Sequence, residues 1–335
     1  MRQIICIGSS GKDIFLPTDE GIILDTPEDI TSQKKFAFEL GAKYQIDDRF
    51  EALGGCAANV SVGLARLGIR VSCYTKIGDD MLGKWIGSEL EKEKVKTDLI
   101  QTEKDCRSDL SAIIVNAKSG ERTIFFNRDA NEKLEIFPEK LKDTDWIFAS
   151  ALNGEWEKNL DAIIGLVKKE NIKLAFNPGQ RNIKDNPQKV IETIKNCNLL
   201  LLNKDEAIEI ISNKKKEESG KQINKEIFLI KELRNMGPEI VVITDGLRGA
   251  WASGSKNLFY IQAIGDSPID TTGAGDAFSS AFLAGCLKGK KIEESLKWGA
   301  ANGGSAVKFY GAIEGLLDTE SLGEIVKNIQ VEKIA

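Results

Sequence analysis

The sequence Asp-Thr-Thr-Gly-Ala-Gly-Asp-Ala-Phe, from Asp270 to Phe278, is the stretch that decides the fold. A polar turn precedes it, and small and apolar residues from 277 to 287 follow it and predict a buried helix. The motif is therefore a glycine-containing loop that opens a helix, where free backbone N–H groups and the positive end of the helix dipole lie. Because Gly273 and Gly275 carry no side chain, a phosphate can approach these N–H groups. The loop predicts an anion-binding cradle.

Asp276 places a carboxylate beside this cradle. A carboxylate would repel a resting anion, but it can accept a proton from an attacking hydroxyl while the N–H groups hold a phosphoryl group. The chain has no histidine, which excludes His general bases and His-ligated metal sites. A simpler interpretation is an ordinary helix start, with glycines for close packing and Asp276 stabilising the dipole.

The full nine-residue motif resembles the second signature of the ribokinase-like (PfkB) carbohydrate kinases. In that family the loop N–H groups hold the transferred phosphoryl group, and the aspartate accepts the proton. Asp270 and Thr272 match positions that hold a monovalent cation in several members, which makes K⁺ an implied additional cofactor. The catalytic residues implied by the resemblance are Gly273, Ala274, Gly275 and Asp276.

A second motif begins at Leu53, where Leu-Gly-Gly-Cys-Ala-Ala-Asn opens an amphipathic helix that Gly68 ends. Alone it indicates a tight turn with a local asparagine cap. It also resembles the first family signature, whose glycines and asparagine hold sugar hydroxyls. Cys56 stands where ribokinases often have lysine, so the identity of the sugar stays open. The acceptor-binding residues implied by the resemblance are Asp13, Gly54, Gly55 and Asn59.

Three further motifs resemble parts of the family's nucleotide site. Asn-Lys-Asp-Glu at 203–206 fits an N-x-x-E pattern used near magnesium, which prefers oxygen ligands and often binds through water. Its alternative interpretation is an asparagine cap with a glutamate in the first helical turn. Thr-Asp-Gly-Leu-Arg-Gly-Ala at 244–250 resembles a turn beside the nucleotide, and the late helix around 298–304 resembles a border of the adenine pocket. The resemblance thus implies ATP and Mg²⁺ as cofactors, with Glu206 near the metal. The cofactor-binding residues that it implies are Asn203, Glu206, Thr244, Gly246, Gly249 and Asn302.

The hydrophobic pattern predicts the fold class independently of these motifs. Short apolar strands alternate with amphipathic helices, which is typical of an α/β protein whose parallel sheet is covered on both faces. A hairpin is predicted with its turn at 117–120. The resemblance implies a ribokinase-like three-layer α/β/α fold and one domain, 1–335, with a small β-sheet lid inserted at about 14–50 and 107–129. Strands are predicted at 3–8, 70–77, 146–149, 174–176, 199–202 and 240–244, and helices at 160–170, 187–196 and 227–236.

Composition excludes several other classes. The net charge of −5 gives no basic surface for nucleic acid or an anionic membrane. The sequence shows no apolar run long enough to span a bilayer and no signal peptide, so we expect a cytoplasmic protein. Six scattered cysteines without a C-x-x-C pair predict neither a zinc site nor a disulfide framework. The glycines that begin at residue 8 lack the G-x-G-x-x-G spacing of a dinucleotide-binding fold. The G-x-x-x-x-G-K string at 78–84 is followed by Trp85 instead of Ser or Thr, which argues against a P-loop.

Together the motifs and their resemblance to the family imply in-line transfer of the γ-phosphoryl group of ATP to a primary hydroxyl of a sugar or ribonucleoside, with Asp276 as base. A sugar-phosphate kinase of the same family and a non-catalytic nucleotide- or sugar-binding sensor remain alternatives. We expect no nucleic-acid or membrane partner. An exposed lid sheet needs cover, which predicts a homodimer through the lid.

Overall fold

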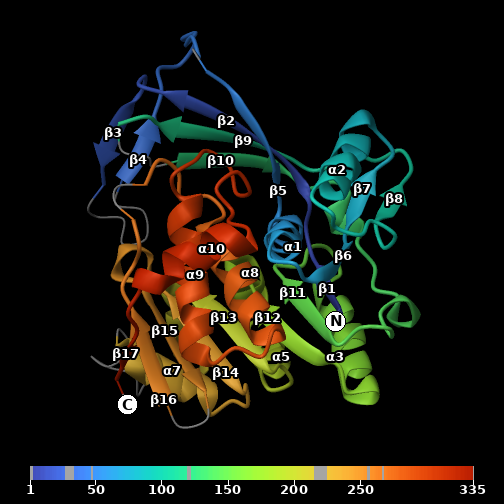
Figure 1. Cartoon of the computed structure of the whole chain (residues 1–335). Helices are drawn as coiled ribbons and strands as arrows, with labels where there is room; N and C mark the ends of the chain where they lie inside the picture. The colour runs from blue at the N-terminus through green and yellow to red at the C-terminus, as the bar shows by residue number, and fades with distance from the viewer. Residues whose placement is uncertain are drawn as a thin grey trace.

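The centre of the computed structural model is a nine-stranded sheet (Figure 1). The structure describes residues 3–26, 34–46, 48–118, 122–214, 225–254, 257–265 and 268–334. Six strands run parallel, from β6 to β14, and three antiparallel strands extend the sheet beyond β14. In spatial order they are β6 (Arg70–Tyr74), β1 (Gln3–Ile7), β11 (Trp146–Ser150), β12 (Lys173–Asn177), β13 (Leu199–Asn203), β14 (Ile240–Thr244), β15 (Ala250–Gly254), β16 (Asn257–Ile261) and β17 (Glu332–Lys333).

Helices cover both faces of this sheet. Alternate side chains of β1 show why: Ile4 and Cys6 belong to one hydrophobic cluster, and Ile5 and Ile7 belong to the other. The predicted three-layer α/β/α fold is therefore confirmed. The first cluster includes α1 (Cys56–Arg66), α2 (Met81–Lys92), α8 (Ala274–Leu287), α9 (Ile292–Ala306) and α10 (Thr319–Ile325); the second includes α3 (Trp156–Glu170), α4 (Gln180–Asp185), α5 (Pro187–Ile194), α6 (Lys204–Lys214) and α7 (Glu226–Arg234).

A separate four-stranded sheet, called the lid below, lies across one end of the body (Figure 1). Its order is β10 (Arg122–Asn127), β9 (Leu110–Asn116), β2 (Gly11–Thr18) and β5 (Phe50–Gly54). Phe15 and Ile113 are buried in a small cluster on which Tyr310 packs, so one face is covered by the body. The edge strand β10 is largely exposed. A hairpin of β3 (Ile22–Asp25) and β4 (Lys34–Ala37) extends from this region.

One local prediction differs from the structure. The single strand predicted at 70–77 is split, because β6 ends at Tyr74 and β7 (Lys76–Gly78) pairs with β8 (Gln101–Glu103). The predicted hairpin turn at 117–120 extends beyond the described residues. The G-x-x-x-x-G-K string at 78–84 forms the start of α2, where Asp80 caps the helix by accepting a hydrogen bond from Gly83 N at 2.7 Å. No helix among the described residues is long and apolar enough to cross a membrane.

Candidate active site

The predicted cradle lies at the start of α8. Gly273 is its N-cap residue, with φ 72°, a left-handed conformation that favours glycine. A Cβ at Gly273 would lie 2.3 Å from the Cβ of Ala312, so the position also has no room for a side chain. A Cβ at Gly275 would meet nothing within 4 Å, and this residue is exposed. Gly273 therefore shapes the loop, and Gly275 leaves its outer side open.

Asp276 lies in the first turn of α8 and is held by α1. Asn59 Nδ2 donates a hydrogen bond to Asp276 Oδ2 at 2.8 Å, and Cys56, one turn before Asn59, donates a second. The two helices pack closely, since a Cβ on Gly63 would lie 2.2 Å from Ser280 Oγ. Burial raises the pKa of Asp276 to about 6, while the hydrogen bonds from Asn59 and Cys56 oppose this rise. A carboxylate with this pKa is suited to accept a proton near neutral pH.

The predicted acceptor residues lie on the lid side of Asp276. Asp13 is buried within β2, not in a loop after β1 as expected, and its negative charge contributes to the raised pKa of Asp276. Burial also raises the pKa of Asp13. Gly54 makes room for this carboxylate, because a Cβ there would lie 2.1 Å from Asp13 Oδ2. Asn59 Oδ1 is buried and has no hydrogen-bond partner among the described residues. Two acceptors for hydroxyl protons thus lie near Asp276.

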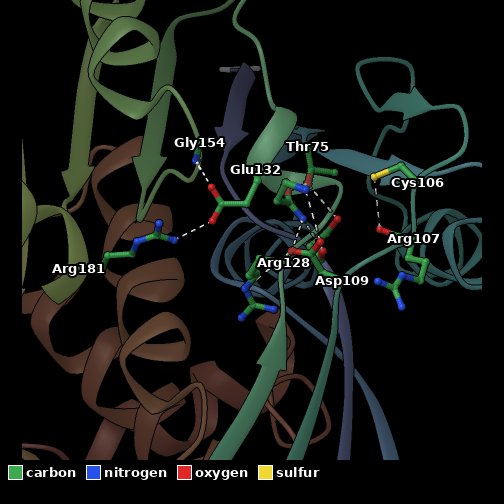
Figure 2. Close-up of polar contacts among 10 residues, drawn as sticks. Thr75, Cys106, Arg107, Asp109, Arg128, Glu132, Gly154 and Arg181 are labelled. Atoms are coloured by element: carbon green, nitrogen blue, oxygen red, sulfur yellow. Dashed lines mark hydrogen bonds and ion pairs between the residues drawn. The ribbon is translucent and has the colours of Figure 1, made fainter.

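A buried polar network fixes the junction of lid and body (Figure 2). The Asp109 side chain, fully enclosed at the start of β9, accepts a hydrogen bond from Asn131 Nδ2 at 2.9 Å and lies 3.7 Å from Arg128 Nε. Asn131 also accepts from Thr75 Oγ1 at 3.0 Å and donates to Ser10 O at 2.9 Å. Ser10 directly precedes β2, so the network holds the start of the strand that carries the acceptor-side aspartate.

Glu132, next to this network, connects it to the body. Its Oε1 accepts from Arg181 Nη1 at 2.7 Å, and its Oε2 accepts from Gly154 N at 2.8 Å (Figure 2). Because Arg181 belongs to α4, the segment after β10 is tied to the layer of helices below it. Composition and motifs gave no signal for this network, since its members come from six separate segments.

Two adjoining cavities continue from the cradle. The larger, about 430 Å³, lies between the 244–250 turn and α9, and mostly apolar groups line it, including Leu247, Ile264 and Phe278. The smaller, about 250 Å³, contains Asp276. The two share Thr244, Thr271 and Gly275, so they form one continuous trough. Among the predicted nucleotide-side residues, the trough is lined by Asn203, Glu206, Thr244, Gly246 and Gly249.

Asn302 is placed elsewhere. It is fully buried, its Nδ2 donates to Ala277 O at 2.8 Å, and its Oδ1 accepts from Leu317 N at 2.8 Å. Helix α9 instead reaches the larger cavity through Ala300 and Gly303. The asparagine therefore fixes the packing of α9 on α8, and small residues one and two positions away form the cavity wall.

Asn203 and Glu206 form the reciprocal helix cap that was the alternative interpretation of their motif. Glu206 N donates to Asn203 Oδ1 at 2.8 Å, and Asn203 N donates to Glu206 Oε2 at 3.0 Å. Glu206 is 6% exposed; burial raises its pKa to about 7, and the charge of Asp276 adds to this effect. Although it takes part in this cap, Glu206 also lines the smaller cavity.

Asp270 organises the loop before the cradle. Its Oδ1 accepts from Thr272 N at 2.9 Å and from Thr272 Oγ1 at 2.7 Å, while its Oδ2 accepts from Gly311 N at 3.2 Å. The residue is 1% exposed. These contacts hold the loop in the shape that begins α8. No group of three or more His, Cys, Asp or Glu side chains with metal-binding geometry occurs in the described part of the chain.

Comparison with known proteins identifies the family of this chain. The family model described as pfkB family carbohydrate kinase matches residues 36–320. The chain belongs to this family. Relatives of this pfkB member include a Bacillus subtilis ribokinase, 26% identical over 97% of this chain and 100% of the relative. An ATP-dependent 6-phosphofructokinase of Thermoanaerobacterium thermosaccharolyticum is 23% identical over 85% of this chain and 88% of its own. The solved nucleoside kinase of Methanocaldococcus jannaschii has a TM-score of 0.74 and 23% identity, with 98% of each chain covered.

Membership identifies the protein as a pfkB-type sugar or nucleoside kinase, a phosphotransferase that acts on an alcohol group. The predicted recognition, fold and enzyme class are thereby confirmed. The structure adds two arginines that the motifs did not assign to roles. Arg122 lines the smaller cavity, and the charge of Arg128 acts on Asp13 and on Cys56. Both flank β10, whose sequence carries no family signature.

Proposed function

We propose that this kinase transfers the γ-phosphoryl group of ATP to a primary hydroxyl of an unphosphorylated pentose, hexose or ribonucleoside. The observation that carries the proposal is the position of Asp276. Its carboxyl group lies in the helix turn that follows Gly273, close to the two proposed hydroxyl acceptors, Asp13 and Asn59 Oδ1. A hydroxyl bound by those acceptors can give its proton to Asp276 and attack a phosphoryl group held by the cradle N–H groups.

The two cavities suit the two ends of a nucleotide. The larger cavity has mainly apolar walls and a size appropriate for a base and ribose. The smaller one holds the open N-terminus of α8, which favours phosphate. ATP as donor is also supported by the relative that is an ATP-dependent 6-phosphofructokinase. Gly273, Ala274 and Gly275 would provide the backbone environment of the transferred group.

The same cavity fits a magnesium ion. Asn203 and Glu206 present oxygen donors, and a hard cation with several water ligands needs few direct protein contacts. We propose that Glu206 would hold Mg²⁺ through water, and the ion when bound would neutralise charge on the phosphates. A K⁺ site at Asp270 and Thr272 is a further proposal, supported by the tightly ordered loop that these residues form.

The acceptor half of the site favours a neutral ligand. Arg128 is the nearby cation, and its charge is offset by two carboxylates, Asp109 at 3.7 Å and Asp13. An acceptor phosphate would therefore meet a locally negative environment. We also propose a homodimer through the lid, since Phe125 and Phe126 on β10 are 63% and 61% exposed.

The test is ADP formation from Mg-ATP with a panel of pentoses, hexoses, ribonucleosides and sugar phosphates. We expect turnover with a member of the first three groups. Turnover with sugar phosphates alone would contradict the proposed acceptor class, and nucleotide binding without turnover on any acceptor would favour a sensor. Replacing water by ¹⁸O-labelled water separates transfer from hydrolysis, because transfer leaves no label in the product phosphate.

A further inference from the structure

A buried lysine joins two strand ends beside the trough. Asn203 and Thr244 are paired in register at the carboxyl ends of β13 and β14, where the ladder between these strands ends. Lys204 and Asp245 directly follow these two residues along the chain. The Lys204 side chain is 8% exposed, and its Nζ lies 3.3 Å from the enclosed Oδ2 of Asp245. The ion pair therefore continues the connection between the two segments after the backbone pairing has ended.

Each member of this pair has one further charged partner. Glu226, the first residue of α7, accepts a hydrogen bond from Lys204 Nζ at 2.5 Å. Arg248 Nη2 lies 2.6 Å from Asp245 Oδ2. The cluster thus combines two cations with two carboxylates and offers no net positive charge to a phosphate. Loss of one partner would leave a buried charge uncompensated, which is costly, so the cluster favours one arrangement of the segments that carry it.

The residues next to the ion pair form walls of both cavities. Glu206, two residues after Lys204, lines the smaller cavity. Thr244 and Gly246, on either side of Asp245, line the larger one. Neither member of the ion pair is among the described residues that line these cavities. The pair can therefore act on a bound ligand only through its neighbours in the chain.

We propose that Lys204 is a positioning residue for the nucleotide, because its ion pair with Asp245 fixes the start of α6 relative to the 244–250 turn. This inference rests on the proposed function, in which the larger cavity holds the base and ribose and the smaller one holds the phosphates. A nucleotide that fills both cavities needs both walls at one separation, and walls that are already in place lower the cost of binding. Asp13 and Asn59 belong to β2 and α1, so acceptor binding should not depend on this pair.

The test compares Lys204→Met with Lys189→Met. Lys189 is a matched control, since its side chain is 9% exposed and its Nζ pairs with the carboxylates of Asp161 and Glu192 on the far side of α5 from no cavity wall of the trough. We expect Lys204→Met to raise the Kd of Mg-ADP, measured by calorimetry, and the KM of Mg-ATP by roughly 10-fold. The kcat at saturating ATP and the acceptor KM should change little, because the lost interaction supports binding of the donor alone. Lys189→Met should show a comparable fall in Tm and an unchanged Kd of Mg-ADP.

A second variant tests the ion pair itself. Asp245→Asn keeps the shape of the side chain and removes its charge, and we expect a similar loss of Mg-ADP affinity even if Lys204→Met does not fold. In the double variant the loss should be smaller than the product of the two single losses, because both substitutions remove the same interaction.

Three results would overturn the inference. These are a wild-type Kd of Mg-ADP in Lys204→Met or Asp245→Asn, an equal loss of affinity in Lys189→Met, and single losses that multiply in the double variant. The proposed function is tested separately by turnover of the wild-type protein. Absence of turnover with every acceptor would contradict the proposed transfer, whereas the Mg-ADP measurements would still decide the role of Lys204.

Discussion

The substitution Gly275→Ala tests the phosphate-binding role of the cradle without disturbing the fold. A Cβ at this position meets no atom within 4 Å, whereas a Cβ at Gly273 would lie 2.3 Å from another side-chain carbon. Gly275 lines both cavities, so the added methyl group would enter the trough itself. The two glycines of one motif should therefore respond differently to the same chemical change.

The expected magnitudes follow from these distances. In Gly275→Ala the fold should keep or gain stability, since alanine in a helix is favoured over glycine by about 0.5–1 kcal/mol. A phosphate oxygen needs about 2.9 Å to a backbone N–H, but contact with a methyl carbon holds an oxygen at about 3.3–3.6 Å. We expect the lost hydrogen bond to lower kcat by about 10²- to 10³-fold, which corresponds to about 2.7–4 kcal/mol. Gly273→Ala should instead lose stability, because left-handed backbone alone costs an L-residue roughly 1–2 kcal/mol.

The assay pairs thermal unfolding with steady-state ADP formation on the same preparations. Gly165→Ala is the matched control, because Gly165 is an exposed helical glycine in α3 whose Cβ also meets nothing within 4 Å. It should show the same small gain in Tm and unchanged kcat. A Gly275→Ala variant with wild-type kcat would refute the assignment of the phosphate to this helix start. A large fall in the Tm of Gly275→Ala would show that the added methyl group clashes with neighbouring atoms.

Three further predictions address the base and the lid. Asp276→Asn should remove turnover and leave ATP binding equal or slightly tighter by calorimetry, because a repulsive charge is lost; more than a few per cent residual kcat would contradict its role as base. Because the pKa of Asp276 is about 6, its carboxyl group should lose its proton, and kcat/KM should rise, as the pH increases through 6. Asn59→Ala removes a hydrogen bond that lowers this pKa, so the rise in kcat/KM should occur about 1–2 pH units higher. A rise at the same pH in the variant would assign the titration to another group. Light scattering should show a dimer at micromolar concentration and a monomer after Phe125→Glu with Phe126→Glu; a wild-type monomer would refute the lid interface.

The sequence predicted the body of the fold well because its strands are nearly continuous apolar runs. The segment Leu199–Leu202 is buried throughout in β13, and such runs have few alternatives to a covered parallel sheet. The division of residues 70–78 between two sheets was not predictable in the same way. The pairing of β7 with β8, from Lys76 with Gln101 to Gly78 with Glu103, separates β7 from β6, and pairing partners are not visible in local periodicity.

The candidate site was predictable where one short motif contains both the backbone shape and the functional group. The glycines and Asp276 of α8 are such a case, and so is the Gly54–Asn59 segment. Asn302 lay close to the expected place, but its short polar side chain found partners inside the helix layer. The place of Arg122 in the smaller cavity had no such signal in the sequence. That place depends on where an edge strand meets a distant loop, and this information lies in the tertiary structure alone.

The charges of the site show why both arginines matter to one reaction. On the proposed function, Asp276 and Glu206 line the donor half with Arg122, while Asp13 and Asp109 lie in the acceptor half with Arg128. Each half thus combines two carboxyl groups with one guanidinium, and the two arginines flank the same strand, β10. Removing that strand from the body would take Arg122 away from Asp276 and Glu206 in the smaller cavity. On the proposed function, the site would then favour an anionic donor only when the lid lies over it.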